Sequence, residues 1–173
     1  DFEVVATRAM ALSGEPWLGW ELGASMTLSS HGFLGYAAMS SATLGEALEL
    51  AVKYFRTRST LVQLETFTDG DMAVMQINEL LALGDLAPLI MESLFSSFHF
   101  MGEKLVPGLD VIGELRFSYP EPDYFARMRP VMPVPVASIA RPSSRIAFQS
   151  PMSTRRSLAY MKSISRRFSD SGQ

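Results

Sequence analysis

The chain has 173 residues, of which 47% are hydrophobic and none is cysteine. This length suits one domain with a substantial hydrophobic core, and the lack of cysteine excludes a disulfide framework and a thiolate metal site. No apolar run approaches the roughly 20 residues of a membrane-spanning helix, and the N-terminus has no feature of a signal peptide, so the expected location is the cytoplasm, with no membrane partner.

Charge is distributed unevenly, although the net charge is only −3. Residues 1–126 carry 6 basic and 17 acidic side chains, for −11, whereas residues 127–173 carry 9 basic and 1 acidic, for +8. Such segregation suggests that the C-terminal part faces a polyanion or an acidic partner. The alternative is that the acidic body and the basic tail attract each other.

The N-terminal part is expected to hold two short helices and then a loop. Apolar spacing predicts a helix to about Leu12, and the turn signal that follows it separates this helix from a second helical segment at about 17–24. The stretch "SSHGFLGYAAMSS", residues 29–41, is rich in glycine and other small residues. It is interpreted as a loop whose glycines place Phe33 and Tyr36 against the interior.

A capped amphipathic helix is expected to follow that loop. Thr43-x-x-Glu46 forms a capping box, in which each side chain accepts from an otherwise unpaired backbone N–H. The apolar stripe of this helix consists of Leu44, Ala47, Leu48, Ala51 and Phe55.

The middle of the chain predicts a hairpin and a long helix. Two β-prone runs, at about 60–67 and 72–78, flank an Asp-Gly pair that is typical of hairpin turns. Asp85 can cap the next helix, which is expected to end near Leu105.

The last third predicts a strand over 110–120, a short helix in "DYFARM" and two short strands joined around residues 141–143. A basic amphipathic helix is expected from Ser153. Because helices and hairpins interleave without a regular βαβ alternation, the sequence predicts a single α+β domain. Its mostly antiparallel sheet of hairpins is expected to pack with several amphipathic helices.

Residues that could carry catalysis are sparse. A zinc site needs three or four ligands, yet the chain has two histidines, 68 residues apart, and no cysteine. Nucleophile-elbow, Walker and dinucleotide-binding motifs are all missing from the sequence. We therefore expect no catalytic residue, no metal and no cofactor, and a small enzyme is the least favoured class.

A polar strip on the long predicted helix is the best candidate for ligand contacts. Glu92, Ser96 and His99 lie at i, i+4 and i+7, so their side chains project from one side. With nearby aromatic rings they could line a pocket in which an acid and an imidazole orient a small ligand. The alternative is a partly exposed polar face with a locally satisfied histidine. The predicted ligand-binding residues are Trp20, Phe33, Tyr36, Glu92, Phe95 and His99.

Four stretches, in order along nearly the whole chain, resemble a known family. They are "RAMALSGEPWLGWELGASM", "HGFLGYAAMSSATLGEALELAVKYFRTR", "VIGELRFSYPEPDYF" and the closing hairpin "PVPVASIARPSSRIAFQS". The sequence is similar to the N-terminal effector-binding domain of AraC/XylS-type transcription regulators.

This resemblance implies an effector-binding and dimerisation domain at residues 1–152. Residues 153–173 would be a basic helix and the start of a linker to a C-terminal helix-turn-helix domain, so the chain would be a piece of a longer regulator. The implied partners are an unknown and partly apolar small-molecule effector, a second copy of the chain, and DNA through the missing domain. The implied role is a transcription activator. The alternative is a dimerisation domain that binds no ligand.

Overall fold

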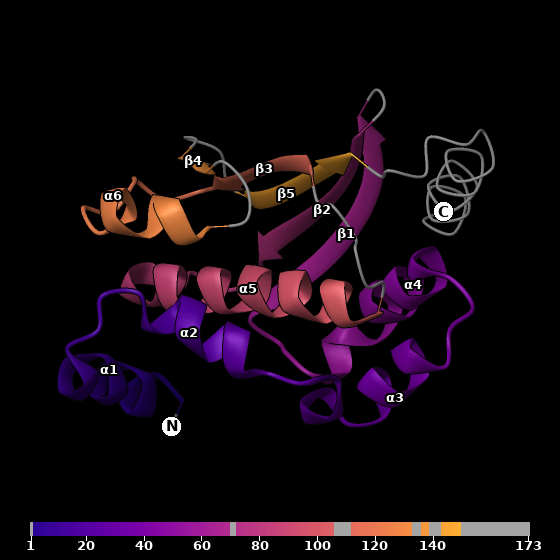
Figure 1. The fold of residues 1–173 in the computed structure, drawn as a ribbon. Helices are drawn as coiled ribbons and strands as arrows, with labels where there is room; N and C mark the ends of the chain where they lie inside the picture. The colour runs from indigo at the N-terminus through magenta and orange to yellow at the C-terminus, as the bar shows by residue number, and fades with distance from the viewer. Residues whose placement is uncertain (1, 70–71, 106–111, 133–135, 139–142, 150–173) are drawn as a thin grey trace.

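The described residues form a five-stranded sheet with helices against one of its faces (Figure 1). The computed structural model describes residues 2–69, 72–105, 112–132, 136–138 and 143–149. The strands are β1 Val62–Asp69, β2 Met72–Glu79, β3 Ile112–Phe117, β4 Val136–Ser138 and β5 Ser143–Gln149. The helices are α1 Phe2–Ser13, α2 Leu18–Ser25, α3 Phe33–Met39, α4 Leu44–Tyr54, α5 Ala87–Leu105 and α6 Phe125–Met128. Short 3-10 turns are η1 Leu28–His31, η2 Phe55–Thr57, η3 Gly84–Leu86 and η4 Arg129–Val131.

The sheet has the strand order β1-β2-β5-β3-β4, and its neighbours are antiparallel except for the parallel pair β3 and β4. The predicted α+β class with a mostly antiparallel sheet in a single domain is therefore confirmed. The last two strands are not a hairpin, however, because β3 lies between β4 and β5. Their adjacency in sequence suggested a direct pairing that the sheet does not make.

One face of the sheet supplies half of the hydrophobic core. Leu64 of β1 lies opposite Ile77 of β2, and both side chains are buried together with Leu115 and Phe117 of β3. Successive strand residues point to opposite faces, and the residues between these are polar, as in the run "ELRF" of β3. The alternation explains why the helices cover only one face.

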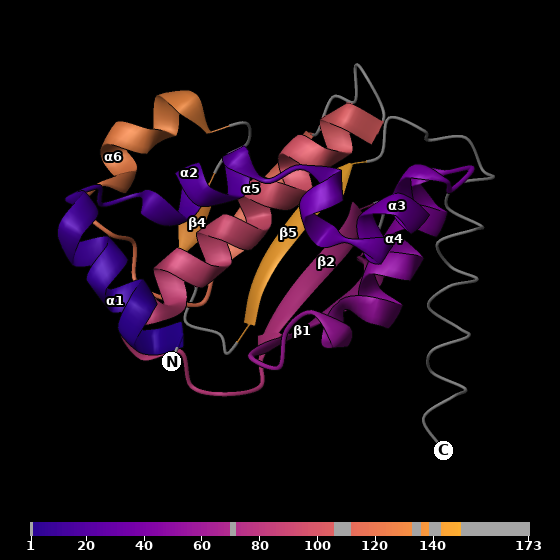
Figure 2. The same ribbon diagram turned by 90° about the horizontal axis from the view of Figure 1, so that it is seen from below.

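The long helix α5 lies between the sheet and α2, so it is buried on two sides (Figure 2). Towards the sheet, the Phe95 ring meets the Phe117 ring edge to face, with centroids 5.2 Å apart. Towards α2, a Cβ added at Gly19 would lie 2.5 Å from the Leu89 carbonyl oxygen, and one at Gly23 would lie 2.2 Å from that of Ser93. Only glycine permits this close approach of two helix backbones.

The stretch interpreted as a loop is helical, and this prediction was wrong. Residues 28–31 form η1 and residues 33–39 form α3, separated by Gly32 at φ 59°. A Cβ at Gly35 would lie 1.6 Å from the Leu28 carbonyl oxygen, so this glycine serves close packing. The two glycines thus connect and pack short helices.

The other predicted helices and strands are confirmed with small shifts, but Asp85, the predicted cap of the long helix, lies inside η3, and α5 begins at Ala87. Thr43 caps α4 by accepting from the Glu46 N–H at 3.1 Å, while the Glu46 carboxylate accepts from the N–H of Ala42 at 2.8 Å. Strand β1 continues to Asp69, beyond its expected end. The predicted basic helix from Ser153 lies outside the described residues. Among those described, no helix has both the length and the apolar character needed to cross a lipid bilayer.

Candidate functional site

A buried carboxyl group with two phenol partners is the most unusual polar feature of the core. Glu92 lies on α5 and is only 1% exposed. Its Oε1 accepts hydrogen bonds from the Tyr124 hydroxyl at 2.5 Å and from the Tyr119 hydroxyl at 3.2 Å. We call these three residues the Glu92 cluster. The cluster joins α5 to the segment that leads from β3 to α6.

The environment of Glu92 favours its neutral form. Burial raises the pKa of Glu92 to about 7, although the hydrogen bonds from Tyr124 and Tyr119 act in the opposite direction. Burial also raises the pKa of both tyrosines, and the nearby carboxylate raises them further. The phenols therefore stay protonated and serve as donors. Glu92 is the group of the cluster whose charge can change near neutral pH.

The chain places the two tyrosines on either side of a proline-rich turn. Tyr119 follows the end of β3, and its ring stacks on Phe117 with centroids 5.0 Å apart. Tyr124 precedes α6, and its ring meets Phe125 edge to face at 5.3 Å. The Phe125 N–H bonds to the Pro122 carbonyl, which closes the turn. The two hydroxyl groups that meet the carboxyl group therefore belong to rings that pack on Phe117 and Phe125.

The predicted polar strip on α5 divides among three neighbours. Glu92 meets the two tyrosines, whereas the Ser96 hydroxyl donates to the Trp20 carbonyl of α2 at 2.8 Å. His99 lies 3.5 Å from Glu103 on its own helix, and burial lowers the pKa of His99. The strip therefore does not converge on a single pocket in the described part of the chain.

Of the six predicted ligand-binding residues, Trp20, Glu92 and Phe95 belong to the buried interior. Trp20 and Phe95 lie in the same hydrophobic cluster as Phe117 and Phe125. His99 is partly buried beside Glu103. Their role in ligand binding stays a prediction.

Phe33 and Tyr36 lie elsewhere, so the expectation that they face the interior was wrong. The two side chains are 94% and 56% exposed on α3. The buried position of that helix is Gly35, which packs against Leu28, so the rings on either side point outward. Contact of Phe33 or Tyr36 with an effector also stays a prediction.

Sequence reasoning missed Tyr119 and Tyr124 as partners of Glu92. They are 27 and 32 residues from it in the chain. A usable signal was present, because the Tyr-Pro-x-Pro-x-Tyr pattern of 119–124 turns the chain back and brings its two aromatic ends together. No local sequence pattern indicates that Glu92 is the partner of these two tyrosines.

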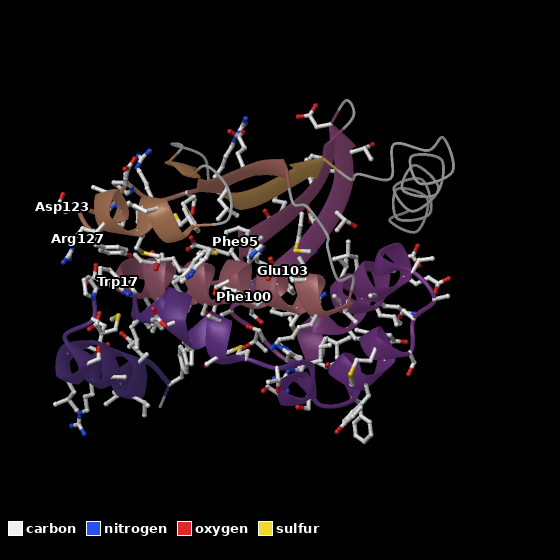
Figure 3. All side chains as sticks on the ribbon, viewed as in Figure 1. Trp17, Phe95, Phe100, Glu103, Asp123 and Arg127 are labelled. Atoms are coloured by element: carbon white, nitrogen blue, oxygen red, sulfur yellow. The ribbon has the colours of Figure 1, made fainter. Side chains whose placement is uncertain are left out.

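A second contact ties α6 to the N-terminal helices. The Arg127 guanidinium lies over the Trp17 ring, 5.0 Å from its centroid, and Figure 3 shows the two side chains facing each other between α6 and the start of α2. Arg129 pairs with Glu121 at 2.5 Å. Both arginines near the cluster are thus engaged with other groups.

The described residues offer little for catalysis. They contain no group of three histidine, aspartate or glutamate side chains able to hold a metal ion. Serine hydroxyls on α5 have partners: that of Ser93 donates to the Ile90 carbonyl, and that of Ser97 lies 3.3 Å from the His31 ring nitrogen. The Glu92 cluster can bind and orient a polar group.

Comparisons with known proteins give a matching family model, a relative and a structure of similar fold. The model of the arabinose-binding domain of AraC transcription regulators, N-terminal, matches residues 1–152. The chain is 37% identical over 136 residues to the ornithine utilization regulator of Pseudomonas aeruginosa, a match that covers 78% of this chain and 40% of the relative. Its fold is similar to the crystal structure of the transcriptional regulator CdpR from Pseudomonas aeruginosa, with a TM-score of 0.63 and 20% identity over 86% of this chain and 55% of that one.

The relatives are transcription regulators and not enzymes, as the sequence predicted for this chain. The chain spans 40% of the length of the curated relative.

Proposed function

Because this chain belongs to the family of arabinose-binding N-terminal domains of AraC transcription regulators, we propose that it senses a small-molecule effector and forms a homodimer within a longer regulator. Residues 1–152 are the sensor in this proposal, and residues 153–173 lead towards a domain that binds DNA. The net charge of +8 over residues 127–173 supports a position near phosphates. The regulator would activate transcription in the cytoplasm.

The buried carboxyl group of the Glu92 cluster is the main support for the proposed sensing role. A carboxyl group buried in an aromatic core costs stability unless its charge is compensated, and a hydrophobic residue of similar size would fill the same space. A ligand that compensates the charge would explain why this position holds a glutamate and not a hydrophobic residue. Perturbed carboxyl groups of this kind gather at functional sites.

The cluster is also in a position to report on binding. It connects α5, which packs on α2, with the turn before α6. A ligand that contacts Glu92 and the tyrosines in one arrangement of these elements, and not in another, shifts the equilibrium by the difference in its affinity for the two. This difference would set how strongly the effector changes the regulator.

The test is a thermal titration of the 173-residue chain with amino acids, amines, carboxylic acids, sugars and fatty acids. L-Ornithine belongs in the set because the relative is named as an ornithine utilization regulator. A compound that binds only the folded chain raises the melting temperature as its concentration increases. A saturable rise is the expected result. Unchanged melting with every class of compound would contradict the sensing role.

A ligand-independent dimerisation domain is the second candidate. It is favoured by large apolar side chains that the described surface leaves exposed, among them Leu12, Phe33 and Tyr36. Apolar groups of this size on a surface are typical of protein contacts. This candidate predicts a stable dimer with no response to any small molecule.

A further inference from the structure

The Glu92 carboxylate has no basic partner in the described structure. Its hydrogen-bond partners there are two neutral phenols, and the ion pairs of the described residues involve other acids. Arg127 is engaged with Trp17, and Arg129 with Glu121. Among the described residues, two hydroxyl donors are therefore what compensates the charge when Glu92 ionises.

An ionised carboxylate at this position favours a cation over an anion. Tyr119 and Tyr124 meet Glu92 through their hydroxyl groups, and their rings contact Phe117 and Phe125. The phenols are neutral, so the full negative charge of the group is that of the carboxylate itself.

The type of cation follows from the number of ligands. A metal ion requires several oxygen or nitrogen ligands, and the described residues gather no such group. An ammonium group needs fewer partners, because its N–H groups can donate to a single carboxylate. An amine thus fits the cluster better than a metal ion does.

The charge near the cluster is mixed at its turn and acidic over the larger part of the chain. Glu92 is buried, whereas Tyr119 and Tyr124 are half-buried. On the exposed turn between the tyrosines, Glu121 pairs with Arg129, and Asp123 is exposed as well. Residues 1–126 carry a net charge of −11. A field of this sign concentrates cations near the domain.

We propose that the effector of this domain carries a cationic amino group, which binds the Glu92 carboxylate between Tyr119 and Tyr124. This inference rests on the proposed sensing function and specifies the chemistry of its ligand. The ammonium N–H groups donate to the carboxylate, and the tyrosine hydroxyls keep their hydrogen bonds to Oε1. The proposal concerns only the amino group and does not limit the size of the rest of the effector.

The first experiment compares compounds that share a skeleton and differ in charge. Melting temperature and calorimetric affinity of the wild-type chain are measured with putrescine, 1,4-butanediol and succinate, and with L-ornithine and other primary amines. We expect the compounds that bind to be amines, with the diol and the diacid inert. If neutral or anionic compounds bind and amines do not, the amine inference is overturned while the sensing function stands. If no compound of any class binds, both are overturned.

The second experiment removes the charge at one site. Glu92→Gln keeps the shape of the side chain, and Glu103→Gln removes a carboxylate from the exposed end of the same helix as a matched control. A charge-assisted hydrogen bond corresponds to about a ten- to hundredfold change in affinity. The Kd of the bound amine should rise by that factor in Glu92→Gln and stay within about twofold in Glu103→Gln.

Equal amine affinity in Glu92→Gln and wild type would overturn the assignment of the amino group to Glu92. Folding of the variant is checked by its melting temperature without ligand. The comparison of putrescine with its two isosteres needs only the wild-type chain, so it tests the charge preference even if the variant does not fold.

Discussion

Glu92 determines how the interior of this domain responds to pH. Its carboxyl group is buried, and Tyr119 and Tyr124 donate to one of its oxygens. The hydrogen bonds stabilise the ionised form of Glu92, but burial destabilises that form by a larger amount, so the pKa of Glu92 rises to about 7. Near neutral pH the group is therefore divided between two charge states.

The raised pKa predicts that the domain loses stability as pH increases. Between pH 4.5, the ordinary pKa of glutamate, and about pH 7, the folded chain holds a proton on Glu92 that the unfolded chain has released. The free energy of unfolding therefore falls by roughly 3 kcal/mol as pH rises through this window, and it levels off above the window.

Denaturant unfolding of wild type and Glu92→Gln at a series of pH values measures this contribution. The difference between the two curves isolates Glu92, because the other titrating groups are common to both proteins. Relative to the variant, wild type should weaken between pH 4.5 and about 7. A difference that does not change with pH would show that the pKa of Glu92 is not raised in the folded chain.

The residues of the site were only partly predictable. Glu92 was identified from the polar strip on the long helix, and Phe95 and Trp20 were chosen as aromatic rings; all three lie in the interior. Phe33 and Tyr36 were assigned to the interior because glycines around them suggested a loop. Tyr119 and Tyr124 meet Glu92 only through the folded sheet, which no local pattern describes.

At the scale of elements, the contact between α2 and α5 depends on two glycines. Gly19 and Gly23 are one helical turn apart and let α2 approach the backbone of α5 at Leu89 and Ser93. The Ser96 hydroxyl then bonds to the Trp20 carbonyl across the same contact. The spacing of the glycines, and not an apolar stripe alone, sets the distance between the helices.

Gly23→Ala should destabilise the domain, although alanine is the better helix former. The added Cβ would lie 2.2 Å from the Ser93 carbonyl oxygen, so the helices must separate. We expect a loss of about 1–3 kcal/mol, the usual range for overpacking. Thermal or denaturant unfolding measures it, with Ser25→Ala on the exposed end of α2 as the control. A variant as stable as wild type would mean that α2 does not approach α5 this closely.

Most elements could be predicted from local pattern, because caps, apolar spacing and turn residues act within a few positions. Thr43 caps α4 as its capping box indicates, and α5 ends at Leu105, where the sequence predicts its end. The order of the strands could not be predicted from local pattern, because β3, which precedes both β4 and β5 in the chain, lies between them in the sheet. The short helices η1 and α3 were missed because a glycine in the sequence can indicate either a loop or a close contact between two backbones.

At the scale of the whole molecule, the domain is layered, with α5 between the sheet on one side and α2 on the other. The core lies between the sheet and α5, and α2 covers the other side of α5 (Figure 2). The Glu92 cluster sits where this layered core meets the turn before α6. Exposed apolar side chains of α1 and α3 lie on the helical side.

The proposed dimer is tested by sedimentation velocity of the chain over a range of concentrations. We expect a species of twice the 19.1 kDa mass of the chain, because large apolar side chains that stay in water favour association. The control is the same experiment in high salt, which weakens charge contacts and leaves apolar ones in place. A monomer at every concentration would contradict the dimer.

The carboxyl carbon of Glu92 gives the most direct measurement of ligand sensing. In the chain labelled with 13C at glutamate side-chain carboxyl groups, its NMR signal is followed with and without a compound that raises the melting temperature. We predict that saturation shifts the Glu92 signal towards the ionised carboxylate and leaves Glu103 nearly unchanged. A compound that stabilises the chain while the Glu92 signal stays in place would contradict the account.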